Sequence, residues 1–199
     1  YADNIELGVS KRFGPFLRLD LTAYYTHLSN AIVRRDYLFN GSPTMQYQGE
    51  ECVVQALQNA AEANVWGIQA AVDSRFARYF YVRANVNWQR GFEELDNGDV
   101  SPSRHVAPLF RRASIGFDNR KLQAEVYTAF QAECDAASMP EEERGKKEIY
   151  ALDANGNPYS PAWITLNMRL SYLILKGLRL HATLENLTDR RYRPYSSGI

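Results

Sequence analysis

The sequence predicts an all-β protein, a transmembrane antiparallel β-barrel, from three observations. Apolar and polar residues alternate in eight separate stretches, which is the period of a strand with one apolar and one polar face. The connections between these stretches alternate between tight turns and long loops, as in bacterial membrane barrels. The 199 residues also include 13 Tyr, 9 Phe and 3 Trp, enough to form aromatic belts at two membrane surfaces.

Composition alone would indicate a soluble domain and not a membrane protein. The net charge is zero, 45% of the residues are hydrophobic, and no run approaches the roughly 18 apolar residues that a membrane helix needs. Transmembrane strands escape such a scan because half of their residues face a polar lumen and each strand needs only about 9–11 residues. The absence of a basic surplus argues against binding to nucleic acid.

Each predicted strand has its own apolar face. The strands are expected at about residues 4–13, 17–24, 66–73, 80–89, 112–118, 122–131, 164–171 and 178–185. In that order, their apolar faces carry Ile5, Leu7 and Val9; Leu17, Leu19 and Leu21; Trp66, Ile68, Ala70 and Val72; Phe80, Val82, Ala84, Val86 and Trp88; Ala113, Ile115 and Phe117; Leu122, Ala124, Val126 and Phe130; Ile164, Leu166, Met168 and Leu170; and Leu178, Leu180, Ala182 and Leu184. The residues between them are mostly polar, so each strand is expected to separate lipid from a polar lumen.

The connections predict the orientation. Tight turns are expected near residues 13–15, 77–79, 119–121 and 175–177, and long loops at about 33–62, 91–108 and 133–161. In an outer-membrane barrel the short turns are periplasmic and the long loops extracellular. A soluble up-and-down barrel also alternates, but its apolar face points inward and it seldom carries three long loops at one end.

The same topology places both chain ends at the extracellular rim. Complete bacterial barrels normally keep both termini in the periplasm and have an even number of strands. We therefore expect these eight strands to be part of a larger barrel, with at least one further strand on each side.

Several phrases of the sequence resemble those of TonB-dependent outer-membrane receptors. The most specific is E-N-L-T-D-R-R-Y-R at residues 185–193, which is similar to the phrase after the penultimate strand in that family. Residues 4–9, 23–33, 59–69 and 161–167 resemble further strand phrases, with Gln69 where the family usually has Glu. The resemblance implies a barrel of about 22 strands around a plugged lumen. Residues 1–199 would be its C-terminal portion, without the plug domain, the early strands and the last strand.

This resemblance also implies a function. Receptors of the family import a scarce nutrient across the outer membrane of Gram-negative bacteria, and the TonB–ExbB–ExbD complex drives import through the plug. The ligand expected here is a ferric siderophore, haem or another iron chelate. The expected surroundings are outer-membrane lipid and lipopolysaccharide, with the long loops extracellular. Two alternatives stay open: a passive porin, and the barrel partner of a surface lipoprotein in glycan or peptide uptake.

The sequence offers no motif for catalysis. Its three histidines, His27, His105 and His181, lack the spacing of metal ligands, and no G-x-S-x-G, H-E-x-x-H or P-loop phrase occurs. We therefore expect no enzyme, no metal site and no bound cofactor. His105, in the second long loop, is either a contact for haem iron or an ordinary solvated histidine.

Ligand candidates can be selected by depth. Inward-facing polar residues nearest the expected outer rim are Asn87, Gln89, Arg112 and Gln131, and His105 is added from the loops. The other inward arginines are expected to pair with inward carboxylates or with the plug.

The two cysteines, Cys52 and Cys134, are candidates for a disulfide. Both are expected at the extracellular rim, and an even number of cysteines in an oxidising compartment favours pairing. The third and sixth strands would be about 14 Å apart, too far for rigid strand ends. The loop that contains Cys52 is long enough to lean across, and pairing with residues of the missing barrel is the alternative.

Overall fold

The computed structural model describes residues 1–95, 98–103, 106–146 and 148–195. No helix among these residues is long and apolar enough to cross a membrane.

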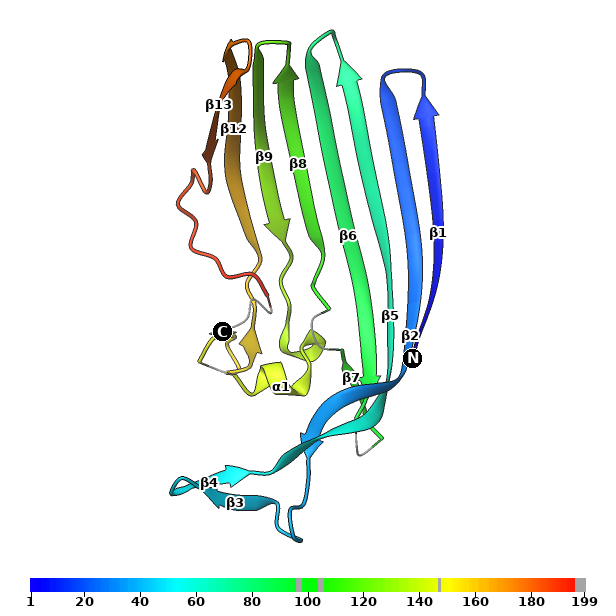
Figure 1. Ribbon diagram of the computed structural model, residues 1–199, viewed down its shortest axis with the longest axis vertical. Helices are drawn as coiled ribbons and strands as arrows, with labels where there is room; N and C mark the ends of the chain where they lie inside the picture. The colour runs from blue at the N-terminus through cyan, green and yellow to red at the C-terminus, as the bar shows by residue number, and fades with distance from the viewer. Residues whose placement is uncertain (96–97, 104–105, 147, 196–199) are drawn as a thin grey trace.

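The eight predicted strands lie in one antiparallel sheet, in sequence order, and form a curved wall (Figure 1). They are β1 (Ala2–Phe13), β2 (Leu17–Asp36), β5 (Gln55–Phe76), β6 (Phe80–Glu94), β8 (Phe110–Asp118), β9 (Leu122–Gln131), β12 (Trp163–Leu175) and β13 (Leu178–Leu184). The short strand β7 (Val100–Pro102) pairs with the end of β6. Within the described residues the wall does not close, and β1 and β13 are its two edges. The fold is therefore a segment of a barrel wall.

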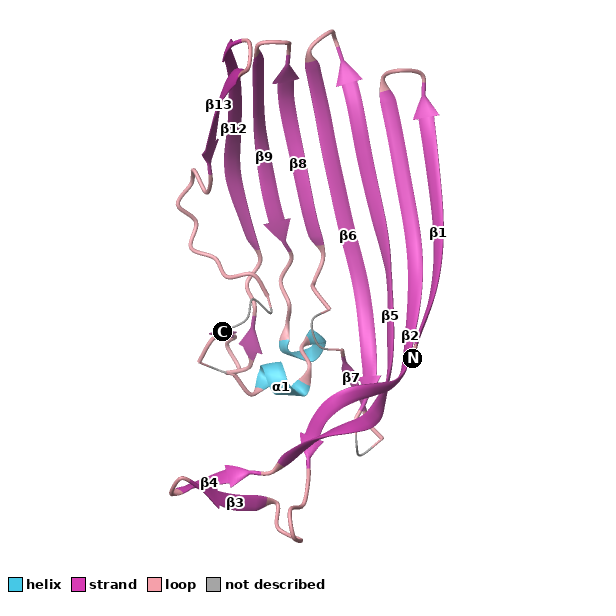
Figure 2. Ribbon diagram, viewed as in Figure 1, coloured by secondary structure: helices cyan, strands magenta, loops and turns pink. Residues whose placement is uncertain are grey.

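The tight turns and long loops lie at opposite ends of the sheet, as predicted (Figure 2). Gly14, Ala77 and Gly177 supply positive φ angles in three of the tight turns. In the fourth turn, the Asn119 side chain accepts hydrogen bonds from the amides of Lys121 and Leu122, at 2.8 and 2.6 Å. The long-loop end carries the small elements η1 (Ala136–Ser138), α1 (Glu141–Arg144), β10 (Ala151–Leu152) and β11 (Pro158–Tyr159).

The first long loop is shorter than the predicted range of residues 33–62, because both neighbouring strands extend into it. β2 continues to Asp36 and β5 already begins at Gln55, and these two residues are paired. The hairpin of β3 (Thr44–Tyr47) and β4 (Glu50–Val53) lies beyond them and projects past the end of the sheet (Figure 1). The alternation missed this extension because the pairing shifts register after Leu28, next to Asn30 with its φ of 52°. A bulge of this kind reverses which residues share a face.

The second long loop is also shorter than expected. β6 continues to Glu94, and β7 folds back to pair with Phe92, Glu93 and Glu94. A strand that extends past the membrane has water on both sides, so its sequence is not required to alternate.

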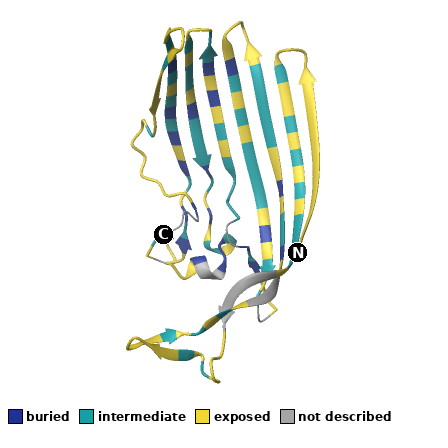
Figure 3. Ribbon diagram, in the orientation of Figure 1, coloured by how far each residue is buried: buried dark blue, intermediate teal, exposed yellow. Residues whose placement is uncertain are grey.

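The two faces of the wall differ as a membrane requires. Apolar side chains on the outward face are exposed, for example Ile68 at 43%, Ile115 at 51% and Ile164 at 51%. The inward face instead buries small polar side chains such as Thr165 and Ser171. Figure 3 shows the resulting bands along the central strands. A soluble protein rarely exposes so continuous an apolar surface. The outward face therefore fits lipid, and the soluble barrel with an inward apolar face is excluded.

Two aromatic belts border this apolar band. Near the tight turns, the ring of Phe80 lies 6.0 Å from that of Phe76 and 5.2 Å from that of Phe117. Toward the long loops, Trp66 and Trp88 meet edge to face at 5.0 Å. Phe80 and Trp88 are eight residues apart on β6, about 26 Å along the strand, or about 20 Å of height at a tilt of about 40°. That height lies within the roughly 25 Å apolar band of outer-membrane barrels.

Neighbouring residues on β2 provide a test of the two faces. Leu21→Arg places a cation in the lipid and should lower the free energy of unfolding by about 2–4 kcal/mol if it lies near the midplane. Thr22→Arg points into the lumen and should cost far less. Urea unfolding of the whole receptor in lipid bilayers, followed by tryptophan fluorescence, measures both. Equal costs would indicate a sheet with water on both faces.

Candidate functional site

The inward face carries a cavity of about 750 Å³ toward the tight-turn end of the wall. We call it the arginine cavity. Its charged lining consists of Arg12, Arg18, Arg75, Arg83, Arg112 and Arg169, with the carboxylates Asp20, Asp73 and Glu125. Alternation along seven strands brings these side chains to one face. Six arginines against three carboxylates make this part of the lumen wall a surface for anions.

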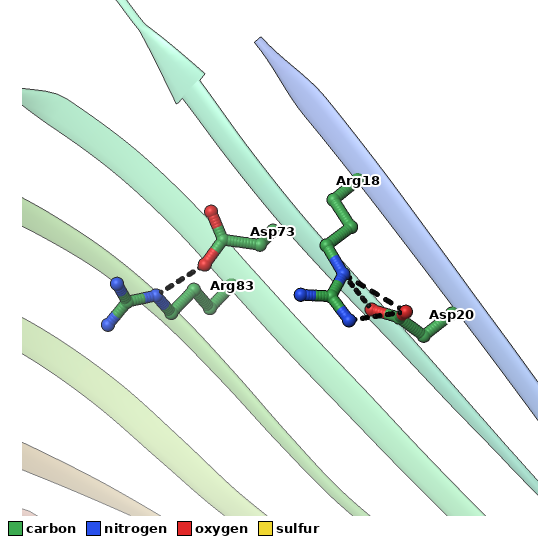
Figure 4. A network of polar contacts seen from close by, with 4 residues as sticks. All are labelled: Arg18, Asp20, Asp73 and Arg83. Atoms are coloured by element: carbon green, nitrogen blue, oxygen red, sulfur yellow. Dashed lines mark hydrogen bonds and ion pairs between the residues drawn. The ribbon is translucent and has the colours of Figure 1, made fainter. Parts of the chain in front are cut away.

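Three of the arginines form ion pairs. Arg18 Nε lies 2.9 Å from an Asp20 oxygen two residues along the same strand. Arg83 Nε lies 2.8 Å from Asp73, its direct partner across the β5–β6 ladder. Figure 4 shows these two pairs.

The third pair is looser, with Arg112 Nη2 3.7 Å from Glu125 Oε1. All three pairs are partly open to solvent, so each contributes only about 0–1 kcal/mol to stability.

Tyrosine rings hold several guanidinium groups in place. Arg112 lies 4.0 Å and Arg169 5.0 Å from the ring centre of Tyr127, and Arg83 lies 4.4 Å from that of Tyr81. Such contacts are worth about 0.5–1 kcal/mol at exposed sites and fix the orientation of the cation.

Two glycines make room for tyrosines on the inward face. A Cβ at Gly116 would overlap the ring of Tyr81, and a Cβ at Gly67 would lie 2.7 Å from the Tyr24 hydroxyl. The rings can therefore lie close against the wall. These pairs were not predicted from the sequence, because they depend on which residues become neighbours across strands.

The predicted ligand residues do not form a single site. Arg112 lines the arginine cavity, whereas Gln89 lines a second cavity of about 250 Å³ at the long-loop end and accepts a 2.7 Å hydrogen bond from Tyr24. Asn87 is half-buried on the same inward face. Gln131 is buried and accepts a hydrogen bond from the amide of Tyr195 at 3.2 Å. His105 lies outside the described residues, so its role stays a prediction.

The third long loop is folded around a small apolar core, which we call the loop core. It consists of Cys134, Met139 and Tyr195, with Tyr150 packed against it. Cys134 exchanges backbone hydrogen bonds with Ser160, at 3.0 and 2.9 Å. Burial, followed by the nearby charge of Asp135, raises the pKa of the Cys134 thiol to about 11. Burial also raises the pKa of the Tyr195 hydroxyl.

The signature phrase at residues 185–193 ties the chain to β12 after β13 ends. The Asn186 amide donates to Asn167 Oδ1 at 2.8 Å, and the Leu187 amide donates to the Leu166 carbonyl at 2.8 Å. Farther along, the ring of Tyr192 lies 4.4 Å from that of Trp163. The phrase therefore has a structural role at the long-loop rim.

The two cysteines are free thiols in separate elements. Cys52 is half-buried on β4, opposite Met45 in the projecting hairpin, while Cys134 is buried in the loop core. A disulfide between them stays a prediction, and the pairing would require the hairpin to fold back over the loop core.

Comparison with known proteins identifies the architecture. The family model for the β-barrel of TonB-dependent receptors matches residues 1–187. The chain belongs to the TonB-dependent receptor family. Members of this family are transporters of the Gram-negative outer membrane, energised through TonB, and not enzymes. No curated protein matches the chain.

Solved structures of whole receptors share the fold of this segment. The copper transporter OprC superposes with a TM-score of 0.70 at 12% identity, over 97% of this chain and 26% of that protein. The FrpB iron transporter of Neisseria meningitidis gives 0.65 at 12% identity, over 97% and 27%. The ferric yersiniabactin uptake receptor FyuA of Yersinia pestis gives 0.60 at 21% identity, over 96% and 25%. The chain thus spans about a quarter of the length of these receptors.

The loop core can be tested through Cys134. Because the thiol is buried and its pKa is about 11, only about one molecule in a thousand carries the reactive thiolate at pH 8. Iodoacetamide should therefore modify Cys134 slowly in the folded receptor, and Tyr195→Ala should speed the reaction at least tenfold. Tyr192→Ala is the matched control, because it removes the contact with Trp163 and leaves the loop core intact. Peptide mass spectrometry of the reduced receptor gives the rates, and an equal acceleration by Tyr192→Ala would contradict the protection by the loop core.

Proposed function

We propose that the receptor containing this segment imports an anionic iron chelate, such as a ferric siderophore or haem, across the outer membrane. TonB–ExbB–ExbD would energise this import through the plug. The observation that carries the proposal is the excess of arginine in the arginine cavity, six guanidinium groups against three carboxylates.

Three of these arginines are available to a ligand. Arg12, Arg75 and Arg169 line the cavity and form no ion pair with the residues that the structure describes. Guanidinium groups match carboxylates with two parallel hydrogen bonds. Ferric iron prefers hard oxygen ligands such as carboxylates and phenolates, and haem carries two propionates, so these chelates are commonly anionic. The cavity is therefore suited to a ligand of this charge.

The similar structures support import but do not select the metal. FyuA is a ferric yersiniabactin receptor and FrpB is an iron transporter, whereas OprC is a copper transporter. At these identities the likeness concerns the fold alone. The charge of the lumen wall favours an anionic chelate over a bare metal cation, because six arginines would repel the cation.

One observation favours a second candidate, a barrel that works with a surface lipoprotein. The hairpin of β3 and β4 projects past the sheet and exposes Tyr47 at 60% and Val53 at 62%. Leu38, just before the hairpin, is 58% exposed. Apolar side chains so far from the wall are suited to contact with another protein.

We further propose that the long loops are extracellular. A single cysteine at Gly145, in the third long loop, should react with a membrane-impermeant maleimide on intact cells. A cysteine at Lys176, in a tight turn, should react only after the outer membrane is permeabilised. The reverse pattern would invert the proposed orientation.

Iron uptake tests the main proposal. Arg169→Gln removes one unpaired cation and should weaken binding of an anionic ferric chelate about tenfold, the equivalent of one charge-assisted contact of roughly 1.4 kcal/mol. Lys11→Gln, which removes a lipid-facing cation near the tight turns, is the control. Uptake of radiolabelled iron chelates by iron-starved cells measures the effect, with immunoblots to confirm equal receptor levels.

One result would contradict this proposal: deletion of the whole receptor without loss of any iron-chelate uptake would exclude iron import. If the intact receptor then co-purifies stably with a surface lipoprotein from the parent strain, the second candidate is supported.

A further inference from the structure

Two arginines face outward, on the lipid side of the wall, in the half of the sheet that carries the Trp66–Trp88 belt. Arg111 begins β8 opposite Phe130, and its guanidinium lies 4.1 Å from the centre of that ring. Arg90, on β6, is the direct partner of Trp66. Both arginines are exposed. Neither forms an ion pair with a residue that the structure describes.

The register leaves no doubt about the face of Arg111. It is paired with Val86 on one side and Phe130 on the other, and both belong to the lipid-facing set. The next residue, Arg112, points into the lumen, where it contacts Tyr127 and Glu125. Two consecutive arginines therefore meet two different environments.

The height of Arg111 explains how a cation is tolerated on the lipid side. It stands eight residues before Asn119 in the tight turn, about 26 Å along the strand and about 20 Å of height at a tilt of about 40°. An arginine costs about 2–4 kcal/mol at the midplane but only about 0–1 kcal/mol near the interface. Its stem can lie along the apolar surface while the charged end reaches the headgroups.

We propose that Arg90 and Arg111 bind the phosphates of a lipopolysaccharide molecule in the outer leaflet. Guanidinium groups bind phosphate with paired, charge-assisted hydrogen bonds. Trp66 and Trp88 lie beside Arg90, and tryptophan prefers this boundary between headgroups and chains. Toward the midplane, the same face continues with Ala113 and Ile115, an apolar surface for the acyl chains.

The spacing of the two arginines favours a headgroup with more than one phosphate. Arg90 lies four residues beyond Val86, which is the partner of Arg111 on the neighbouring strand. Their Cα atoms are therefore about 14 Å apart, from about 3.3 Å per residue and about 4.8 Å between strands. A single phosphate would engage one arginine, whereas the bisphosphorylated disaccharide of lipid A is broad enough to engage both. This assignment rests on the proposed extracellular position of the long loops.

Lipid binding to the whole receptor in nanodiscs tests the site. Native mass spectrometry should show bisphosphorylated lipid A bound to the receptor, and the double variant Arg90→Gln/Arg111→Gln should weaken that binding at least tenfold. Arg112→Gln, the inward neighbour, is the matched control and should leave lipid binding unchanged. Monophosphorylated lipid A should bind the unaltered receptor more weakly than the bisphosphorylated form.

Other outcomes would overturn the site. Equal binding by the double variant, an equal loss with Arg112→Gln, or equally tight binding of phosphatidylglycerol would each contradict a lipopolysaccharide site. Heat-modified mobility on gels confirms that the variants are folded. Iron uptake is measured separately, so failure of lipid binding with normal uptake refutes the site and leaves the proposed function standing. If the cysteine at Lys176, and not the one at Gly145, is labelled on intact cells, the long loops are periplasmic and the lipopolysaccharide site is refuted.

Discussion

The hydrogen-bond ladder between neighbouring strands is the constraint on which the rest of this structure depends. Inside a bilayer no water is available to the backbone, so every amide and carbonyl needs a partner on an adjacent strand. The ladder from β1 to β13 meets this demand for the interior strands by antiparallel pairing on both sides. That register also decides the environment of each side chain, since a slip of one residue would exchange the lipid-facing and lumen-facing sets. Arg111 and Arg112 show how sharp this division is, because one meets lipid and its neighbour meets the lumen.

The sequence predicts the membrane part of the fold well because alternation is enforced only where the two faces meet different solvents. All eight strands were located in this way, and they pair in sequence order. The prediction failed beyond Leu28, where the register of the β2–β5 pairing shifts. No polarity pattern marks the extension of β2 to Asp36 or the start of β5 at Gln55.

The candidate site was less predictable, for a related reason. The face of each arginine follows from its position along one strand, so the inward set could be identified from the sequence. The contact of Arg83 with Tyr81 also needs the room that Gly116 leaves for that ring, and this depends on the relative register of β6 and β8. Gln131 was predicted as a ligand contact because of its depth, and this stays a prediction. In the structure it accepts a hydrogen bond from the amide of Tyr195, which is 64 residues away in sequence.

The signature phrase at the end of the chain marks the place where the membrane constraint ends. β13 stops at Leu184, and the following residues must leave the ladder without abandoning their hydrogen bonds. Asn186 adopts a φ of 53°. Its side-chain oxygen accepts a 3.0 Å hydrogen bond from the Arg190 amide, and its own backbone amide donates one to Asn167 Oδ1. Asp189 adopts a φ of 49°, a conformation that Asn and Asp tolerate better than most residues. The phrase can therefore be recognised from sequence because its residues meet backbone requirements at the rim, whereas ligand selection depends on side chains elsewhere on the wall. This is why a short motif can identify the family without identifying the ligand.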